Sequence, residues 1–459
     1  MHNSYADIAI MKVLLISANT VVEPYAVYPL GLDYVAAALA ADHEVACLDM
    51  NVVAEDDALT LAIHRFAPDL IGVSLRNIDN TDALNPESYV PLYRRLVEKI
   101  RQFCDVPIVL GGSAFTMFPE TLMALLDADY GIVGEGERMP QLLDALENGD
   151  NPSKIHGVIC RSGASTQALP LSEASNGRLS ATPAGIDFYL RHGGMLNLQT
   201  KRGCPFRCVY CSYPNIEGRV MRHHAPSKIA EDALARQDAG ARYLFITDSA
   251  FNADPEHSLA VARALKSIGL TIPWGGFFAP MRMPGGYFDI LAECGLTHVE
   301  FGTEALCDSV LQAYGKPFRV SHVFDAHRAA RAAGLHVAHY FLFAGPGESE
   351  QTLATSLSRI DRLNKTVLFL FCGMRIYPHT ALYELALKQG QIESDPSILE
   401  PVFYRSPRIT VSRAADMIAE HAKERKNWVH AAGGEATGET LDRMYRGGFS
   451  GPLWEYLIR

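Results

Sequence analysis

Short apolar runs alternate with amphipathic helical patterns along residues 12–148. The predicted strands cover residues 12–18, 44–50, 70–75, 107–112 and 130–137. Between the first two, apolar residues recur at i, i+3, i+4 and i+7 from Leu32, which is the spacing of one helix face. Strands that alternate with helices in this way predict a parallel, doubly wound, Rossmann-like α/β domain over residues 11–150. Ligands of such sheets bind beyond the carboxyl ends of the strands.

The pattern changes twice further along the chain. Residues 151–192 are rich in turn residues and predict a linker with a small hairpin at most. Strand candidates then follow at residues 195–200, 243–248, 271–278, 298–303, 336–343 and 367–377. Because six βα units are too few for a closed eightfold barrel, residues 193–395 predict an open partial (β/α)6 barrel. Residues 396–459 predict a small, mostly helical C-terminal segment, with one amphipathic helix at 413–429.

The composition is that of a globular protein with more than one domain. The chain has 459 residues, of which 48% are hydrophobic, and this length exceeds one typical core. A net charge of −11 argues against nucleic-acid binding, because phosphate contacts need clustered Lys and Arg. No apolar run is long enough to span a bilayer and no signal peptide is recognisable, so we expect a cytoplasmic protein. Residues 1–10 are expected to be a short tail before the second methionine, Met11.

Nine cysteines are present, six of them isolated in the sequence. An odd number of scattered cysteines is not a secreted disulfide framework. We expect the isolated ones to be buried small hydrophobes. They are Cys47, Cys104, Cys160, Cys294, Cys307 and Cys372.

The remaining cysteines, Cys204, Cys208 and Cys211, follow a C-x3-C-x2-C spacing directly after the first strand of the second region. Three thiolates on one short loop can bind three irons of a cubane cluster, and the fourth iron is then open to a substrate. A zinc site is the alternative, with His223 or His224 as the fourth ligand, although both lie beyond a loop that contains Pro and Asn.

This cysteine loop resembles the signature of the radical SAM superfamily, including Tyr210 just before the third cysteine. Residues 247–252 follow the second strand of the barrel and are similar to the family segment that holds the amino group of S-adenosylmethionine. The resemblance implies that Asp248 and Ser249 bind this cofactor. Asp248 taken alone is as consistent with a structural hydrogen-bonding role.

The resemblance continues at the expected intervals in the second half of the barrel. Glu304, followed by Leu311 and Lys316, is similar to the family pattern around the ribose and the methionine carboxylate. Residues 343–349 follow the fifth strand, and residues 374–380 follow the sixth, where the family makes adenine contacts. The order of these segments supports the resemblance more strongly than any one of them.

The resemblance implies reductive chemistry with a [4Fe–4S] cluster. The reduced cluster cleaves S-adenosylmethionine to methionine and a 5′-deoxyadenosyl radical, which abstracts hydrogen from an unactivated carbon. The electron is expected from a donor such as flavodoxin or ferredoxin. The protein then orients the reactants and excludes side reactions.

Residues 12–148 resemble the cobalamin-binding domain that precedes the radical SAM domain in one large subgroup. The resemblance places cobalamin against two loops of small residues, which let the backbone approach a bulky nucleotide tail. These candidate residues are Gly111, Gly112 and Ser113 in one loop and Gly134 and Gly136 in the other. A Rossmann-like nucleotide site or a scaffold without cofactor is the alternative.

The sequence departs from the pattern of other cobalamin enzymes at the residues expected near cobalt. Residues 19–25 lack the D-x-H-x-x-G pattern that supplies a histidine ligand in other cobalamin enzymes. We therefore predict no histidine coordination from this domain. Arg76, at the end of the third strand, is the candidate to lie under the corrin, and a contact to a phosphate or carboxylate is the equal alternative.

Two enzyme functions follow from the resemblance. The first is cobalamin-dependent methylation of an unactivated carbon in a small-molecule or lipid intermediate, and the second is radical cyclisation or rearrangement without methyl transfer. A cobalamin or Fe–S sensor would need an output module, which the sequence does not show. The substrate pocket is expected between the two domains and the C-terminal segment. Tyr404, Arg405, Arg408 and Trp428 are candidates for its lining, but core packing or surface pairing is the favoured role for each of them.

Overall fold

The computed structural model describes residues 10–22, 25–53, 56–163, 165, 171, 185–394, 398–423, 425–430 and 434–458. These residues divide into two compact units. The first contains residues 1–21, 29–78 and 89–186, and the second contains residues 22–28, 79–88 and 187–459. Nearly all of the predicted tail and much of the predicted linker lie outside the described residues. The predicted domain boundaries stay predictions.

The first unit is built on a six-stranded sheet in the order β2-β1-β3-β4-β5-β6. Its strands are β1 (Lys12–Ser17), β2 (Glu44–Asp49), β3 (Leu70–Ser74), β4 (Ile108–Gly111), β5 (Tyr130–Ile132) and β6 (Val158–Cys160). The first five pair in parallel, as the alternating pattern predicts. β6 pairs antiparallel with β5 and forms one edge of this sheet, inside the segment predicted as a linker. Its three residues are too short a run for sequence periodicity to reveal.

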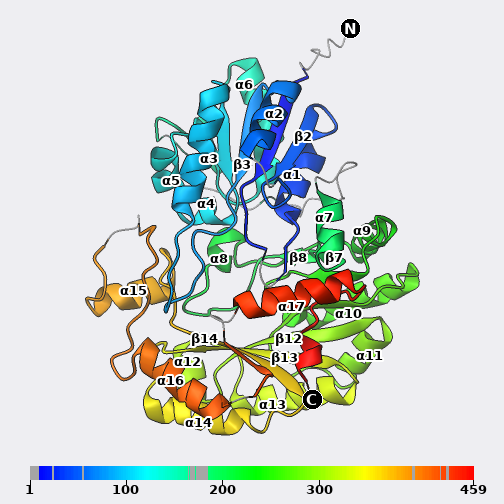
Figure 1. Cartoon of the computed structure of the whole chain (residues 1–459), viewed down its shortest axis with the longest axis vertical. Helices are drawn as coiled ribbons and strands as arrows, with labels where there is room; N and C mark the ends of the chain where they lie inside the picture. The colour runs from blue at the N-terminus through cyan, green and yellow to red at the C-terminus, as the bar shows by residue number, and fades with distance from the viewer. Residues whose placement is uncertain are drawn as a thin grey trace. The chain divides into compact units, whose positions relative to one another are not determined.

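Helices cover both faces of this first sheet. They are α1 (Leu30–Leu39), α2 (Asp56–Phe66), α3 (Val90–Phe103), α4 (Ser113–Met117), α5 (Pro119–Leu125) and α6 (Met139–Asn148). Leu32 of α1 and Leu142 of α6 pack with Val13 and Leu15 of β1 in one core. Side chains alternate along a strand, so the intervening Leu14 faces the other side of the sheet. Helices α2 and α3 pack beside each other (Figure 1). The doubly wound α/β prediction is confirmed.

The second unit is built on a seven-stranded sheet in the order β15-β14-β13-β12-β11-β10-β7, with every pairing parallel. Its strands are β7 (Met195–Leu198), β10 (Tyr243–Ile246), β11 (Trp274–Phe278), β12 (Leu296–Glu304), β13 (His336–Phe343), β14 (Thr366–Cys372) and β15 (Trp428–His430). A two-stranded ribbon of β8 (Lys201–Arg202) and β9 (Arg222–His223) lies apart from this sheet. The six predicted strands are all present, and β15 is an addition.

β15 corrects one prediction about the C-terminal segment. The helix expected over 413–429 is α16 (Val411–Ala422), and it ends where Lys423 adopts a positive φ of 52°. Trp428 then pairs with Leu368 of β14. The prediction is wrong after Ala422 because the apolar spacing of the helix continues by chance into a short strand, and a partner strand outweighs local helix propensity.

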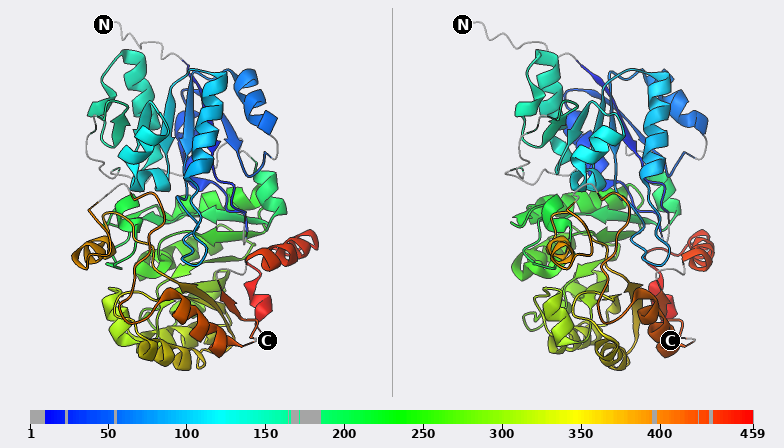
Figure 2. Two further views of the ribbon diagram at one scale, coloured as in Figure 1. Left: turned by 60° about the vertical axis from the view of Figure 1, so that its left-hand side comes forward. Right: turned by 90° about the vertical axis from the view of Figure 1, so that its left-hand side faces the viewer.

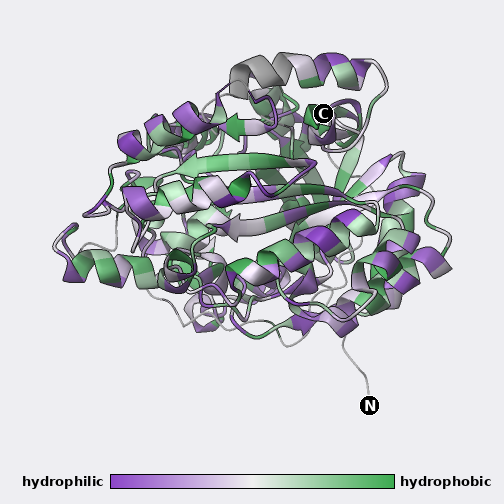
Figure 3. Cartoon of the chain, turned by 90° about the horizontal axis from the view of Figure 1, so that it is seen from below, coloured by the Kyte–Doolittle hydropathy of each residue, from purple (hydrophilic) through white to green (hydrophobic). Residues whose placement is uncertain are grey.

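Helices cover the outer face of the second sheet (Figure 2). The helices of this part of the chain are α7 (Ile186–Arg191), α8 (Tyr213–Ile216), α9 (Pro226–Asp238), α10 (Pro255–Ser267), α11 (Tyr287–Glu293), α12 (Asp308–Ala313), α13 (Val320–Ala332), α14 (Glu350–Ile360), α15 (Ala381–Lys388), α16 and α17 (Gly434–Arg446). The strands are largely apolar, whereas the helices present apolar and polar residues on different sides (Figure 3).

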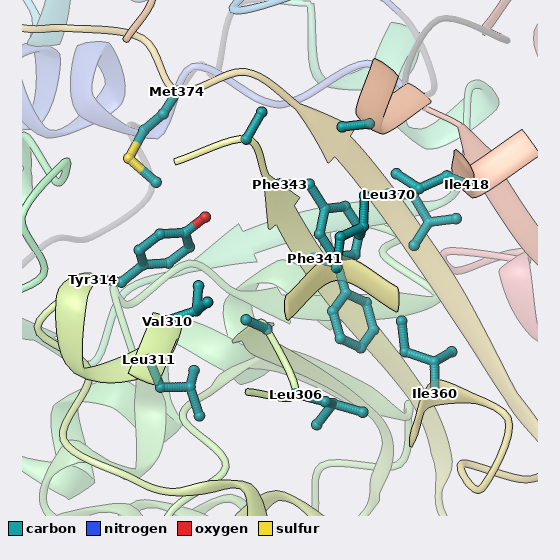
Figure 4. Packing of buried hydrophobic residues seen from close by; sticks show 14 of the residues in the cluster. Leu306, Val310, Leu311, Tyr314, Phe341, Phe343, Ile360, Leu370, Met374 and Ile418 are labelled. Carbon is teal, nitrogen blue, oxygen red and sulfur yellow. The ribbon is translucent and has the colours of Figure 1, made fainter. Parts of the chain in front are cut away.

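The main core of the second unit lies between the outer face of the sheet and these helices. Phe341 and Phe343 of β13 and Leu370 of β14 pack against Val310 of α12 and Ile418 of α16 (Figure 4). This layer fixes one face of β12–β14. The opposite face of the same strands is therefore left to the interior of the partial barrel.

Candidate functional site

The three clustered cysteines lie on the loop that follows β7 and β8, beyond the carboxyl end of the first barrel strand. Close packing fixes this loop. The backbone N–H of Val209 donates to the carbonyl of Tyr314 at 3.0 Å, and a Cβ placed on Gly315 would lie 2.4 Å from the carbonyl oxygen of Arg207. Cys204 is buried, and Cys208 and Cys211 are half-buried. The loop thus presents three sheltered thiols from a rigid support.

A buried polar trio stands beside these thiols. The Tyr210 hydroxyl donates to Glu304 Oε1 at 2.8 Å, and Lys316 Nζ donates to the same oxygen at 3.0 Å. Lys316 Nζ also lies 3.3 Å from the Tyr210 hydroxyl. Glu304 has a positive φ of 63°, at a register shift where β12 pairs with β13. The strain of this backbone directs the carboxylate toward the cysteine loop, which is a common device at functional sites.

Burial and charge set the protonation of this group. Burial raises the pKa of the Cys208 thiol and raises the pKa of Cys211 to about 12, and the Lys316 ammonium opposes both shifts. Burial alone would lower the pKa of Lys316, but the Glu304 carboxylate and Cys208 outweigh it and raise that pKa. Lys316 is therefore a fixed buried cation beside the thiols. Iron binding here must displace protons from thiols that hold them tightly.

Asp248 and Ser249 lie just after β10, at the same end of the sheet. Asp248 is fully buried, and its two carboxylate oxygens accept hydrogen bonds from the backbone N–H and the hydroxyl of Thr200. Asp248 thus ties the end of β10 to the end of β7. The hydroxyl of Ser249 is buried and has no hydrogen-bond partner among the described residues. An unsatisfied buried hydroxyl is suited to a bound ligand, and the cofactor-binding roles of both residues stay predictions.

A second buried carboxylate, Glu348, follows β13 and was not singled out by the sequence. It accepts a hydrogen bond from the backbone N–H of Ala344, and burial raises its pKa from 4.5 to about 7. Because the folded chain holds this proton more tightly than the unfolded chain, stability falls as the pH rises from 4.5 to about 7.

We expect Glu348→Gln to remove this pH dependence, since the amide keeps an acceptor oxygen but does not titrate. Between pH 4.5 and 8, the free energy of unfolding of the wild type should fall by about 3 kcal/mol more than that of the variant. Urea unfolding at several pH values measures the difference. The same dependence of the free energy of unfolding on pH in the two proteins would contradict the raised pKa of Glu348.

In the first unit, the predicted loop residues gather at the carboxyl ends of β3, β4 and β5. The Ser113 hydroxyl donates to the carbonyl oxygen of Arg76 at 2.6 Å, which brings the loops after β3 and β4 together. The backbone N–H of Gly134 donates to Thr116 Oγ1 at 2.9 Å, which brings in the loop after β5. A Cβ on Gly136 would lie 2.6 Å from Val35. These loops form a surface of small residues, and its contact with the cobalamin tail stays a prediction.

Gly112 is the most constrained position on this surface. Its φ is +95°, and a Cβ would lie 2.5 Å from the carbonyl oxygen of Leu75. We expect Gly112→Ala to cost about 1–3 kcal/mol in overpacking beyond the strain of the positive φ, and to weaken corrin retention. Gly149→Ala is the matched control, because Gly149 has a φ of +70° and open space around it. Equal unfolding midpoints and equal corrin content in the two variants would refute this expectation.

The four candidates for the pocket lining take part in core packing and in hydrogen bonds with neighbouring segments of the second unit. Tyr404 is buried in the core of the second unit and donates to Gln389, whereas Arg408 donates to the backbone of Gly347. Trp428 belongs to β15. Arg405 donates to the carbonyl of Gln391. These contacts agree with the core packing and surface pairing favoured from the sequence, and a role of the four residues in a pocket stays a prediction.

His223, one of the two histidines considered for a zinc site, has other partners. His223 lies 3.3 Å from Asp254 and stacks on His257. Among the described residues, no group of His, Cys, Asp and Glu is placed to hold a single metal ion. Cysteines that bind a cubane cluster each ligate a different iron, so they need not converge on one point.

Comparison with known proteins decides between a zinc site and an iron–sulfur cluster. Residues 198–360 match the family model of the radical SAM superfamily, and residues 16–143 match that of the B12 binding domain. The chain belongs to the B12-binding radical SAM enzymes. The two matched regions contain the cysteine loop and the small-residue loops, respectively. The cofactors of this enzyme are therefore a [4Fe–4S] cluster, S-adenosylmethionine and cobalamin.

Several curated relatives of this radical SAM enzyme are methyltransferases. It is 26% identical to the tryptophan 2-C-methyltransferase of Streptomyces laurentii over 449 residues, which cover 82% of this chain and 74% of the relative. It is 24% identical to the cytidylyl-2-hydroxyethylphosphonate methyltransferase of Streptomyces wedmorensis, with 84% of each chain covered. The enzyme thus belongs to the cobalamin-dependent radical SAM methyltransferase family.

Solved structures show the same fold. TsrM from Kitasatospora setae, solved with cobalamin and a [4Fe–4S] cluster, superposes with a TM-score of 0.88 at 22% identity, over 98% of this chain and 97% of TsrM. The cobalamin-dependent radical enzyme OxsB superposes with a TM-score of 0.71 at 16% identity, over 87% of this chain and 65% of OxsB. Among the described residues, no helix is both long and apolar enough to cross a membrane.

Proposed function

We propose that this enzyme transfers a methyl group to an unactivated carbon of a small-molecule substrate. When bound, the cluster and S-adenosylmethionine supply a 5′-deoxyadenosyl radical that removes the substrate hydrogen, and cobalamin supplies the methyl group. One observation carries the proposal. A three-cysteine loop at the carboxyl end of a barrel strand is joined in one chain to a B12 binding domain, and relatives of this chain are named methyltransferases.

Residues of the second unit bind the cluster and S-adenosylmethionine. Cys204, Cys208 and Cys211 ligate the cluster. Lys316 places a buried positive charge beside them, where it favours the thiolates and offers a partner for the methionine carboxylate. The unsatisfied Ser249 hydroxyl provides a further contact to S-adenosylmethionine.

In the first unit, the loops of Gly111–Ser113 and Gly134–Gly136 support the cobalamin tail. No histidine of the loop after β1 is available to cobalt, because residues 18–28 contain none. Arg76 is our candidate for the lower face of the corrin. The reaction also needs a one-electron donor such as flavodoxin or ferredoxin, and we place the enzyme in the cytoplasm, where such donors and free thiols are maintained.

The test uses the anaerobically reconstituted enzyme with S-adenosylmethionine that carries a labelled methyl group. Indole, L-tryptophan and 2-hydroxyethylphosphonate are offered as substrates with a reduced flavodoxin. The proposal predicts deoxyadenosine and a product that contains the label. Deoxyadenosine with an altered but unlabelled product would instead establish cyclisation or rearrangement and overturn methyl transfer.

A further inference from the structure

The carboxyl-terminal halves of β12, β13 and β14 alternate sharply in burial. Residues facing the helices are buried, as at Phe341 and Phe343, whereas residues facing the barrel interior are half-buried, as at Tyr340, Leu342 and Phe369. The same alternation gives buried Thr303 between half-buried neighbours on β12. The interior face of these strands is therefore less covered than the outer face.

Aromatic rings dominate this interior face. Tyr340 pairs in register with Phe369, and their rings stack with centroids 4.7 Å apart and an interplanar angle of 21°. The Phe371 ring is nearly parallel to that of Tyr340, at 6.1 Å and 13°. Phe277 of β11 meets Tyr340 edge-on, at 6.2 Å. We call Phe277, Tyr340, Phe369 and Phe371 the aromatic wall.

The base of the wall is closed and its geometry is fixed. The Tyr340 hydroxyl donates to Glu300 Oε2 at 2.8 Å. The indole N–H of Trp454, in the 3-10 helix η4 (Trp454–Leu457), donates to Glu300 Oε1 at 2.9 Å. Trp454 also packs with Ala338 and Val367, on the same interior face. The C-terminal segment thus forms a floor that holds the Tyr340 ring in one orientation.

The other end of the wall leads to the cysteine loop. Gly302 pairs in register with Tyr340, and Glu304 follows two residues later beside Tyr210. A ring lying on Tyr340 and Phe371 is therefore toward the carboxyl ends of the strands, the end at which Glu304 contacts Tyr210 of the cysteine loop. This placement relates the wall to the reaction centre of the second unit without any residue of the first.

The charges on this face limit what can bind. None of the seven strands of the second sheet carries an Arg or Lys residue. Glu300 is fully buried and accepts two hydrogen bonds, and Glu304 is paired with Lys316. A phosphate or phosphonate group would find no cation on the wall, and burying it there would be costly.

We infer that the aromatic wall binds a flat, uncharged aromatic ring of the substrate by stacking on Tyr340, Phe369 and Phe371. This inference rests on the proposed function and names the substrate class of that same site. Aromatic rings favour offset-stacked and edge-on neighbours, and the wall offers both. A rigid ring also loses little conformational entropy when it is held for hydrogen abstraction.

The test measures binding to the reconstituted holoenzyme by equilibrium dialysis, with indole, cyclohexanecarboxylate and 2-hydroxyethylphosphonate as probes. We expect indole to bind more tightly than the other two. Phe371→Leu keeps the apolar character but removes the ring, so it should weaken indole binding about 3- to 10-fold.

Phe103→Leu is the control, because Phe103 is exposed on α3 of the first unit and the same substitution there should leave binding unchanged. Retained cluster absorption shows that each variant is folded. Equal binding of all three probes, preference for the phosphonate, no binding of indole, or no effect of Phe371→Leu would overturn the inference. None of these results bears on whether the enzyme makes deoxyadenosine or transfers methyl groups, so the two proposals fail separately.

Discussion

Replacing Cys208 with alanine is expected to abolish the cluster and, with it, all cleavage of S-adenosylmethionine. The three thiolates each bind a different iron, so removing one leaves a second iron without a protein ligand. Burial keeps water from substituting effectively at this position, because Cys208 lies in a half-buried loop beside Lys316. Deoxyadenosine formation should fall to the level of the iron-free protein, whereas corrin retention should be unchanged.

Cys104→Ala is the matched control, because Cys104 lies at the end of α3 in the first unit and is not part of the cysteine loop. It should retain the full iron content and activity. If the Cys208 variant kept the wild-type iron content, or if both variants lost equal amounts of iron, the cluster would be held elsewhere.

Replacing Arg375 with methionine is expected to destabilise the second unit severely. Arg375 Nε donates to Asp79 at 2.8 Å, and the side chains are only 3% and 0% exposed. The other guanidinium donors reach the carbonyls of residues 376, 398, 399 and 402. Removing this cation leaves a buried carboxylate with a hydrogen bond from the backbone N–H of Thr81 but without its countercharge, which costs about 3–5 kcal/mol.

Two further variants identify the cause. Asp79→Asn in the Arg375→Met background removes the unpaired charge and should recover part of the loss. Arg413→Met breaks the exposed ion pair with Glu350, which is worth less than about 1 kcal/mol. Urea unfolding midpoints compare the three proteins. A loss for Arg375→Met no larger than that for Arg413→Met would contradict a buried-charge mechanism.

The longer strands could be predicted from the sequence because residues typical of turns flank each apolar run. The run at residues 336–343 is apolar, bounded by a glycine before it and by turn residues after it, and β13 spans those residues. β6 and β15 were not predicted, because the sequence around each shows no strand-like apolar run and each is held by a neighbouring strand distant in sequence. Periodicity carries no information about such a partner.

The candidate site likewise contains residues that the sequence reveals and contacts that only the fold creates. Cysteine spacing is local, so Cys204, Cys208 and Cys211 could be found by inspection. The pairing of Asp248 with Thr200 joins residues 48 positions apart, and that of Arg375 with Asp79 joins residues 296 apart. Such contacts depend on the order of strands in the sheet. The aromatic wall had a weak signal, since Tyr340 and Phe369 alternate with other apolar residues, but only the strand register brings them face to face.

The most direct test of the central claim is the metal content and reactivity of one protein sample. The wild-type chain is purified without oxygen, reconstituted with iron, sulfide and hydroxocobalamin, and separated from unbound cofactor. Iron and cobalt are quantified, and deoxyadenosine is assayed after adding dithionite and S-adenosylmethionine. We predict iron and cobalt in a ratio of about four to one, with reductant-dependent deoxyadenosine. A protein that retains cobalamin but binds no iron and makes no deoxyadenosine would contradict the assignment of the cysteine loop and, with it, the proposed radical reaction.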